Sequence, residues 1–242
     1  MILRDKVVLV SGGGSGIGRQ IARECANEGA RVVAADINQE GLDETVSGRT
    51  NVSSRVTDVT LEQDVSDLVS ETLERFGRID ALVHSAYWTN PQPLLDTAPE
   101  DYERTQRVIL KGAYLLARST IPAMLRQGSG VIIPIASTHS VVAFPNFFAY
   151  QVAKAGLLGY VRSIAADYGP AVRAVALAPG AIQTPALNDA PENLRNELVD
   201  RSLTKRLGTA HDVARAAVYL ISDDSSFMTG NIFLLDGGWT AM

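Results

Sequence analysis

Short aliphatic and β-branched runs alternate with longer amphipathic stretches along the whole chain. This alternation is typical of βαβ units, in which a helix connects each strand to the next parallel strand. The short runs predict strands near residues 7–11, 31–35, 54–58, 80–85, 130–136, 172–178 and 232–235. The stretches between them predict helices near residues 16–28, 39–46, 61–76, 100–126, 149–168 and 210–222. We therefore expect a doubly wound α/β fold, with one seven-stranded parallel sheet, helices on both faces, and a single domain over residues 1–242.

Residues 178–212 interrupt this alternation. Pro179, Pro185 and Pro191 are followed by a polar stretch with helical character. Long irregular segments inside compact domains are often functional lids or binding loops. We expect residues 185–205 to form a lid over the substrate.

Composition narrows the possible partners. The chain has 242 residues, of which 46% are hydrophobic, and it has no run near the roughly 20 apolar residues that cross a bilayer. It also lacks a signal-peptide pattern. Its net charge is -5, and its 22 basic residues are dispersed along the chain. These features favour a cytoplasmic protein with a small-molecule partner and no nucleic-acid or membrane partner. The one cysteine, Cys25, lies in an apolar helical row, which predicts a buried thiol.

A glycine-rich turn follows the first predicted strand, where residues 11–18 read Ser-Gly-Gly-Gly-Ser-Gly-Ile-Gly. Glycine permits positive φ in a tight turn and close approach of the backbone to a pyrophosphate. The helix that begins here offers free N–H groups and the positive end of its dipole. Such turns also occur for geometry alone, but the strand-turn-helix context favours a Rossmann-type dinucleotide site. The expected cofactor-binding residues of this turn are Gly12, Ser15, Gly16, Ile17 and Gly18.

Asp36 ends the second predicted strand, 20 residues beyond Gly16. An acidic side chain at this distance accepts hydrogen bonds from an adenosine ribose and repels a 2′-phosphate. Neither residues 13–15 nor Ile37 supplies a cation to offset that repulsion. The position favours NAD over NADP, and the alternative is a solvated aspartate at the start of a loop.

Tyr150 and Lys154 are four residues apart in a predicted helix, so the phenol and the ammonium share one face. A cation near a tyrosine lowers its pKa of about 10, whereas burial raises it, so the charge of an oxidised nicotinamide would also be needed. Ser137 follows the apolar strand ending at Ala136, at the sheet edge where ligands bind in open α/β folds. It is not in a Gly-x-Ser-x-Gly elbow, which disfavours a hydrolase nucleophile. Each feature alone is more often structural, but together they indicate acid-base chemistry at a carbonyl or alcohol.

The chain closely resembles the short-chain dehydrogenase/reductase family over its whole length. The resemblance rests on Gly12-x-x-x-Gly16-x-Gly18, Asp36, Asp58, Ser137 and Tyr150-x-x-x-Lys154. Two further stretches are similar to the family's nicotinamide-binding segment and to its closing strand and turn: Pro179-Gly180 with Ile182 and Thr184, and Asp236-Gly237-Gly238.

The resemblance implies an oxidoreductase acting on CH–OH groups, a sheet order of 3-2-1-4-5-6-7, and a homotetramer or homodimer built largely on the two long middle helices. It assigns proton transfer to Tyr150, contact with the substrate oxygen to Ser137, and binding of the nicotinamide ribose to Lys154. The same lysine is implied to lower the pKa of the tyrosine. Asp58 and Val59 match the family's adenine contacts, and Ala86 matches a small residue beside the cofactor.

Two positions depart from the family pattern. His84-Ser85-Ala86-Tyr87 stands where the family usually has Asn-Asn-Ala-Gly, and His84 is either a core histidine or a functional one. Tyr87 either points outward or narrows the substrate side. Ile109 occupies the position of an asparagine whose carbonyl anchors a water for proton exchange with the lysine. Gln106 or His139 are candidates to replace that relay.

The substrate side is rich in aromatic residues. Such residues suggest an apolar substrate, which is cyclic or aromatic, although they also favour subunit interfaces. We therefore expect an NAD-dependent oxidoreductase that transfers a hydride between nicotinamide and a secondary alcohol or ketone. The alternatives are a dinucleotide-binding sensor or assembly subunit with little catalysis, and an epimerase or dehydratase. The aromatic residues are Tyr87, Trp88, Phe144, Phe147 and Phe148.

Overall fold

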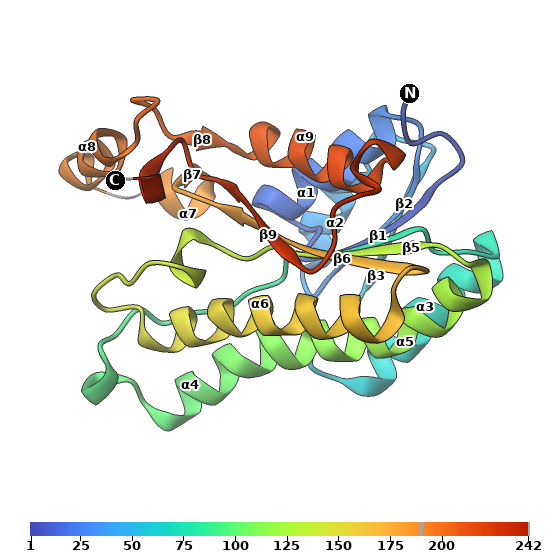
Figure 1. Ribbon diagram of the computed structural model, residues 1–242, viewed down its shortest axis with the longest axis horizontal. Helices are drawn as coiled ribbons and strands as arrows, with labels where there is room; N and C mark the ends of the chain where they lie inside the picture. The colour runs from blue at the N-terminus through green and yellow to red at the C-terminus, as the bar shows by residue number, and fades with distance from the viewer. Residues whose placement is uncertain (189–190, 242) are drawn as a thin grey trace.

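The computed structural model describes residues 1–188 and 191–241, which fold around one twisted parallel sheet (Figure 1). Its strand order is β3-β2-β1-β4-β5-β6-β9, and every neighbouring pair is parallel. The expected order and fold class are therefore confirmed. The strands are β1 (Val7–Ser11), β2 (Arg31–Asp36), β3 (Val52–Val56), β4 (Ala81–His84), β5 (Gly130–Pro134), β6 (Val172–Pro179) and β9 (Asn231–Leu235).

Helices cover both faces of the sheet, as Figure 1 shows. Along β1, Val8 and Val10 pack with α1, α2 and α9, whereas Leu9 packs with α3, α5 and α6 on the other face. All five residues of β1 are buried, because a parallel sheet with helices on both sides has no solvent-exposed face. One layer contains α1 (Gly16–Asn27), α2 (Gln39–Val46) and α9 (Ala210–Ile221); the other contains α3 (Glu62–Phe76), α4 (Pro99–Gln106), α5 (Gly112–Gln127) and α6 (Phe148–Tyr168).

Two elements differ from the sequence-based prediction. The third strand was expected at residues 54–58, but β3 ends at Val56. Asp58 leaves the ladder because its carboxylate accepts the N–H of Thr60 at 2.8 Å and begins a turn. The single helix expected at 100–126 is divided by a π-helical turn, Arg107–Lys111, between α4 and α5. π turns of this kind are frequent at functional sites.

The helical segment Pro99–Gln127 is long and apolar enough, by length and composition, to cross a membrane, since its most apolar 18-residue window has a mean hydropathy of 1.2. In this fold 56% of its most apolar window is buried inside the protein. Leu116 and Ile121, for example, belong to the core beneath the sheet. Its apolar character is therefore accounted for by packing within the domain.

The irregular segment after β6 is enclosed by a short parallel pair, β7 (Ile182–Gln183) with β8 (Gly208–Thr209). It contains α7 (Pro185–Asn188) and α8 (Glu192–Arg201). Its last part is anchored to the C-terminal turn, because the Thr204 N–H donates to the Gly237 carbonyl at 3.2 Å. Residues 189–190 of the lid expected at 185–205 lie outside the described residues, and the lid function stays a prediction.

Candidate active site

The carboxyl ends of the central strands meet at one edge of the sheet. Ser11 ends β1, Asp36 ends β2, His84 ends β4, and Ser137 follows β5. Ligands of open α/β folds bind at this edge, near the point where the strand order reverses between β1 and β4. The predicted site residues therefore come together on the side where this fold class binds ligands.

The glycine-rich turn is closely packed against the loop after β4. Gly12 has a φ of 71°, and a Cβ there would lie 2.5 Å from the Ala86 nitrogen. A side chain at position 12 is thus excluded both by conformation and by contact. Thr184 also lies near this turn, since its Cγ2 would be 3.9 Å from a Cβ on Gly16. The turn, Ala86 and Thr184 are brought together as the sequence predicted.

The amino end of α1 suits an anionic ligand. Ser15 is the N-cap residue, and its side chain makes no capping hydrogen bond. The first turn of α1 contains no acidic residue that would compete for the N–H groups or neutralise the positive end of the dipole. The residues present therefore fit the pyrophosphate of a dinucleotide.

Asp36 is held against the glycine-rich turn. Its Oδ2 accepts the Gly14 N–H at 2.9 Å, and its Oδ1 accepts the Asn38 N–H at 3.0 Å. A Cβ on Gly14 would lie 2.9 Å from the Asp36 carboxyl carbon, so glycine is needed for this approach. The carboxylate is thereby fixed at the end of β2, where a ribose of the adenosine half is expected.

Arg19 is a nearby cation that sequence reasoning missed. Its Nε donates to the Gly14 carbonyl at 3.1 Å, and its Nη1 pairs with the Glu44 carboxylate. The available signal was its place one turn into α1, on the side facing the glycine-rich turn. Because the guanidinium is bound to backbone and to Glu44, its charge is already partly balanced.

The remaining cofactor candidates have clear structural places. Val59 is buried, and a Cβ on Gly112 would lie 3.0 Å from its Cγ2, so its side chain packs on α5 rather than facing solvent. Asp58 forms the turn described above. Pro179 ends β6, and the Gly180 N–H donates to the Leu235 carbonyl of β9 at 3.0 Å. Ile182 is buried in β7.

Tyr150 and Lys154 lie on one face of α6, and Ser137 meets them from the end of β5. The Lys154 Nζ is 5.4 Å from the centroid of the Tyr150 ring and donates to the Ile135 carbonyl at 2.5 Å. A hydrogen bond joins the Ser137 and Tyr150 side chains. Lys154 and Ser137 are both buried. The three side chains expected to carry the chemistry are thus assembled.

Burial governs the protonation of this group. It raises the pKa of Tyr150 well above the ordinary value, while the hydrogen bond with Ser137 acts in the opposite direction. Burial also lowers the pKa of Lys154 to about 7. The expected lowering of the tyrosine pKa is therefore not present in the protein alone. A further positive charge is required to make the phenol acidic near neutral pH.

His84 is a core histidine with both ring nitrogens bound. Its Nδ1 lies 2.7 Å from the Ser11 hydroxyl, and its Nε2 lies 3.1 Å from the Ile109 carbonyl in the π turn. Burial lowers the pKa of His84 to about 4, so the ring is neutral near pH 7. An Nε2–H donor toward Ile109 and an Nδ1 acceptor from Ser11 satisfy the whole network. The sequence left His84 as either a core histidine or a functional one, and the structure confirms the core histidine.

The expected aromatic residues divide into two groups. Phe147 and Tyr87 place their ring centroids 6.2 and 6.4 Å from that of Tyr150. Phe148 instead stacks on Tyr102 of α4 at 6.2 Å, and Arg104 lies over the Trp88 ring. Phe148 and Trp88 therefore pack against α4 and do not face Tyr150.

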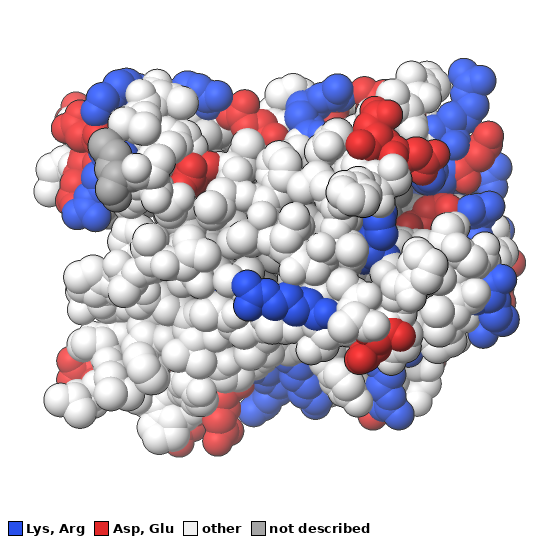
Figure 2. Space-filling model, viewed as in Figure 1, with Lys and Arg blue, Asp and Glu red and all other residues white. Residues whose placement is uncertain are grey.

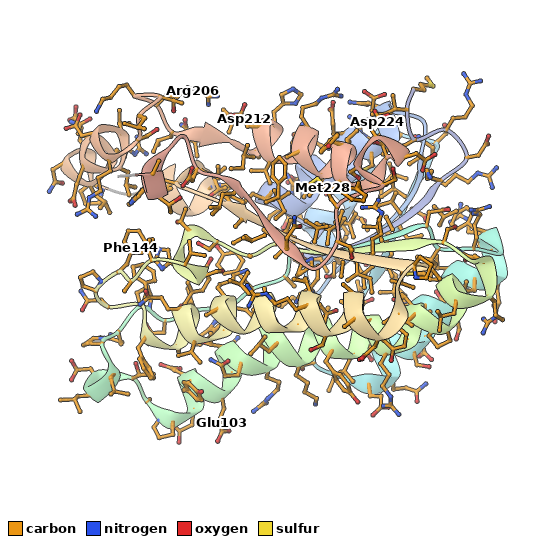
Figure 3. The ribbon with its side chains drawn as sticks, viewed as in Figure 1. Glu103, Phe144, Arg206, Asp212, Asp224 and Met228 are labelled. Carbon is orange, nitrogen blue, oxygen red and sulfur yellow. The ribbon has the colours of Figure 1, made fainter. Side chains whose placement is uncertain are left out.

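A second set of rings extends the tyrosine side of the site. His139 stacks on Phe144 at 4.1 Å and meets the Tyr150 ring edge-on at 5.3 Å. Phe144 in turn contacts Trp239 at 5.2 Å, and Arg201 of α8 lies 5.7 Å over the Trp239 ring. Figure 3 shows Phe144 on the loop before α6, at the end of the molecule that carries α8 and the C-terminus. Trp239 was missed because only the fold brings the C-terminal turn to this loop.

Gln106 is engaged elsewhere. Its side-chain amide donates to the Ala149 carbonyl at 2.9 Å, which ties α4 to the start of α6. This bond gives it a structural role and offers no path to Lys154. Across residues 1–188 and 191–241, no cluster of His, Cys, Asp or Glu side chains could hold a metal ion.

Comparison with known proteins places this site in a family. Residues 12–240 match the family model described as enoyl-(acyl carrier protein) reductase. The 2-(R)-hydroxypropyl-CoM dehydrogenase of Xanthobacter autotrophicus is 38% identical over 98% of this chain and 100% of its own length. Dehydrogenase/reductase SDR family member 6 of Aquarana catesbeiana is 35% identical over 98% of each chain.

The fold comparison agrees. The crystal structure of gox2181 matches with a TM-score of 0.94 and 31% identity, covering 99% of this chain and 98% of that one. Fold, sequence and the arrangement of the site point to the same family. The chain is therefore a member of the short-chain dehydrogenase/reductase family, an oxidoreductase that acts on alcohol and carbonyl groups with a nicotinamide cofactor.

Proposed function

We propose that this protein is an NAD-dependent dehydrogenase that transfers a hydride between nicotinamide and an apolar or cyclic secondary alcohol or ketone. One observation carries the proposal: Ser137, Tyr150 and Lys154 converge at the ligand-binding edge of the sheet, next to an anion-binding turn. A protein that only binds dinucleotides has no need for a buried lysine beneath a partly buried tyrosine at this place.

Each residue has a distinct part in the reaction. Ser137 hydrogen-bonds the substrate oxygen and orients it toward the Tyr150 hydroxyl. In the oxidation, the phenolate of Tyr150 takes the hydroxyl proton while the carbinol carbon loses its hydride, and in the reduction the phenol returns the proton. When bound, a nicotinamide cofactor would supply the hydride acceptor or donor and, in its oxidised form, a positive charge. Lys154 lies beneath the tyrosine, with its Nζ 5.4 Å from the ring centre, and adds positive charge there in its protonated state.

The preference for NAD rests on Asp36. Its carboxylate is fixed by the Gly14 and Asn38 N–H groups, and Ile37 beside it is exposed and apolar. A 2′-phosphate at this position would meet a negative charge, whereas a ribose hydroxyl would meet an acceptor. Arg19 is paired with Glu44 and bound to the Gly14 carbonyl, so it is not free to offset the repulsion.

The apolar character of the substrate is supported by the rings around Tyr150. Tyr87, Phe147 and His139 all place a ring within 6.4 Å of it, centre to centre. In the face shown in Figure 2, the surface between the charged lobe formed by α8 and the end of α4 is largely free of Lys, Arg, Asp and Glu. An uncharged substrate suits such surroundings better than a strongly charged one.

The proposal is tested with purified protein, NAD, NADP and a panel of cyclic and aromatic secondary alcohols. We expect saturable NAD binding, weaker NADP binding, and formation of reduced nicotinamide with at least one alcohol. Tight NAD binding without turnover on any alcohol or ketone would instead support the sensor or assembly subunit. Ile109, which replaces the asparagine of the family's proton relay, is the residue that favours this alternative. Nicotinamide that copurifies and is regenerated in each cycle would support the epimerase or dehydratase.

A further inference from the structure

His139 lies beside Ser137 and Tyr150, and its buried Nδ1 has no hydrogen-bond partner among the described residues. It is two residues after Ser137, and its backbone N–H donates to the Ser137 Oγ at 3.2 Å. Its imidazole is framed by Phe144 at 4.1 Å, Phe147 at 4.9 Å and Tyr150 at 5.3 Å. Within the part of the chain that the structure describes, the buried Nδ1 has no hydrogen-bond partner.

The surroundings keep this imidazole neutral. Burial, with a smaller contribution from the Lys154 charge, lowers the pKa of His139 to about 4. A neutral imidazole has one N–H donor and one acceptor nitrogen. A buried N–H without an acceptor is rarer in proteins than a buried acceptor without a donor, so we assign the proton to Nε2 and the lone pair to Nδ1.

His139 differs in this respect from His84. The His84 ring is fully engaged by Ser11 and Ile109 and so belongs to the core. His139 is only partly buried; two of its three ring neighbours are phenylalanines, and its Nδ1 makes no hydrogen bond to the third, Tyr150. A polar group among apolar walls is the arrangement by which binding sites recognise one particular oxygen or nitrogen of a ligand.

We infer that the Nε2–H of His139 hydrogen-bonds a second, uncharged oxygen of the substrate, on the carbon next to the one that reacts. This inference rests on the proposed function, and it narrows the substrate class to α-hydroxy ketones and vicinal diols, cyclic ones included. His139 contacts both the Ser137 hydroxyl, through its backbone, and the Tyr150 ring. Its imidazole therefore lies close to the two side chains proposed to hold the reacting oxygen, which favours a neighbouring oxygen of the substrate over a distant one. The aromatic walls favour an uncharged group over a carboxylate.

The test compares cyclohexanone with 2-hydroxycyclohexanone, reduced by the wild type and by three variants with saturating reduced nicotinamide. The quantity measured is kcat/KM for the hydroxy ketone divided by kcat/KM for the plain ketone. Dividing the wild-type ratio by the variant ratio cancels the intrinsic reactivity of the two ketones. The variants are His139→Phe, which keeps the ring contacts, His139→Gln, which keeps a donor and an acceptor, and His211→Gln, a matched change at an exposed histidine of α9.

We expect the ratio to fall by about 10- to 100-fold in His139→Phe, to fall less in His139→Gln, and to stay at the wild-type value in His211→Gln. An unchanged ratio in His139→Phe would overturn the inference and leave His139 as a packing residue. Equal losses on both ketones, with a shifted pH profile, would also overturn it, because His139 would then act in proton transfer.

A different set of results would show that the proposed function, and not the His139 subsite, is wrong. If the wild type reduces neither ketone, the same comparison is made on Kd for cyclohexanol and 1,2-cyclohexanediol with oxidised cofactor bound. A diol preference that disappears in His139→Phe would uphold the subsite although the hydride-transfer proposal had failed. No preference in the wild type would overturn the subsite as well.

Discussion

At the scale of single residues, Asp36 carries the cofactor preference. Its carboxylate is fixed by two backbone N–H groups in a place that only glycine at position 14 leaves open. We predict that Asp36→Ala weakens NAD binding and raises the ratio of NADP to NAD affinity by about 10- to 100-fold, which corresponds to about 1.4–2.8 kcal/mol. Fluorescence titration with both dinucleotides measures this ratio. An unchanged ratio would remove the basis for the NAD preference.

The buried ammonium of Lys154 makes stability depend on pH. The pKa of this group is about 7 in the folded protein and near 10.5 in the unfolded chain, so the unfolded chain binds more protons between these values. The free energy of unfolding therefore rises with pH across this window. We predict that Lys154→Met is more stable than the wild type by about 1–4 kcal/mol near pH 7, and that the difference shrinks toward pH 10.

Urea unfolding at several pH values measures this difference. The size of the effect is reduced by loss of the hydrogen bond to the Ile135 carbonyl, which does not itself titrate. A gap between the two proteins that stays constant from pH 7 to 10 would show that the lysine is not desolvated in the folded state.

The individual residues show what sequence reasoning could and could not reach. Tyr150, Lys154 and Ser137 were found because a helical spacing and a strand end are visible in the sequence. Arg19 and Trp239 were missed because their contacts depend on how distant segments pack. Phe148 and Trp88 were assigned to the substrate side by proximity in sequence, whereas side-chain direction sends them toward α4.

At the scale of elements, His84 connects three parts of the fold. It joins the end of β1 at Ser11, the end of β4, and the π turn at Ile109. We predict that His84→Leu lowers the free energy of unfolding by about 2–4 kcal/mol, because it leaves a buried hydroxyl and a buried carbonyl without partners. The exposed His211 provides the control, since His211→Leu should change the free energy of unfolding by no more than about 0.5 kcal/mol.

Chemical denaturation of His84→Leu and His211→Leu measures the free energy of unfolding and shows whether His84 is needed for stability. Equal stability of His84→Leu and His211→Leu would contradict the network.

The π turn itself could not be predicted, because residues 100–126 have the periodicity of one continuous helix. Its Ile109 carbonyl is bound by His84, which lies 25 residues away in the chain.

The central strands β1, β4, β5 and β6, by contrast, were predictable to within two residues at each end. Buried parallel strands are short apolar runs, and those of β1, β4, β5 and β6 stand out against polar neighbours. β7 and β8 were not predictable, because two-residue strands have no periodicity to detect. They matter nonetheless, since they close the base of the segment that contains α7 and α8.

At the scale of the whole molecule, we propose assembly through the layer that contains α4, α5 and α6, which lies away from the N-terminus in Figure 1. Tyr114 and Leu125 of α5 and Val152 of α6 expose large apolar side chains there. We predict a homotetramer in solution, with four times the 25.9 kDa mass of the chain. Tyr114→Arg should shift the mass toward smaller species in analytical ultracentrifugation. A wild-type protein that sediments as a monomer at micromolar concentration would contradict this arrangement.

The fold as a whole also explains why the acidity of the Tyr150 phenol depends on the cofactor. Burial alone raises the pKa of Tyr150, and the lysine beneath it has its own pKa lowered by the same burial. Acid-base chemistry near neutral pH therefore depends on the charge that an oxidised nicotinamide brings to the sheet edge. We propose that the glycine-rich turn, Asp36 and the segment after β6 would hold the cofactor so that its nicotinamide reaches this edge.

Tyr150 is the residue that we propose transfers the substrate proton during hydride transfer. The most direct test of this role is the rate of formation of reduced nicotinamide in wild type and in Tyr150→Phe, each with saturating NAD and the best alcohol from the panel. We predict a loss of about 100- to 10,000-fold in kcat, with NAD affinity changed far less. Equal rates in the two proteins would contradict the account and assign the proton to another group.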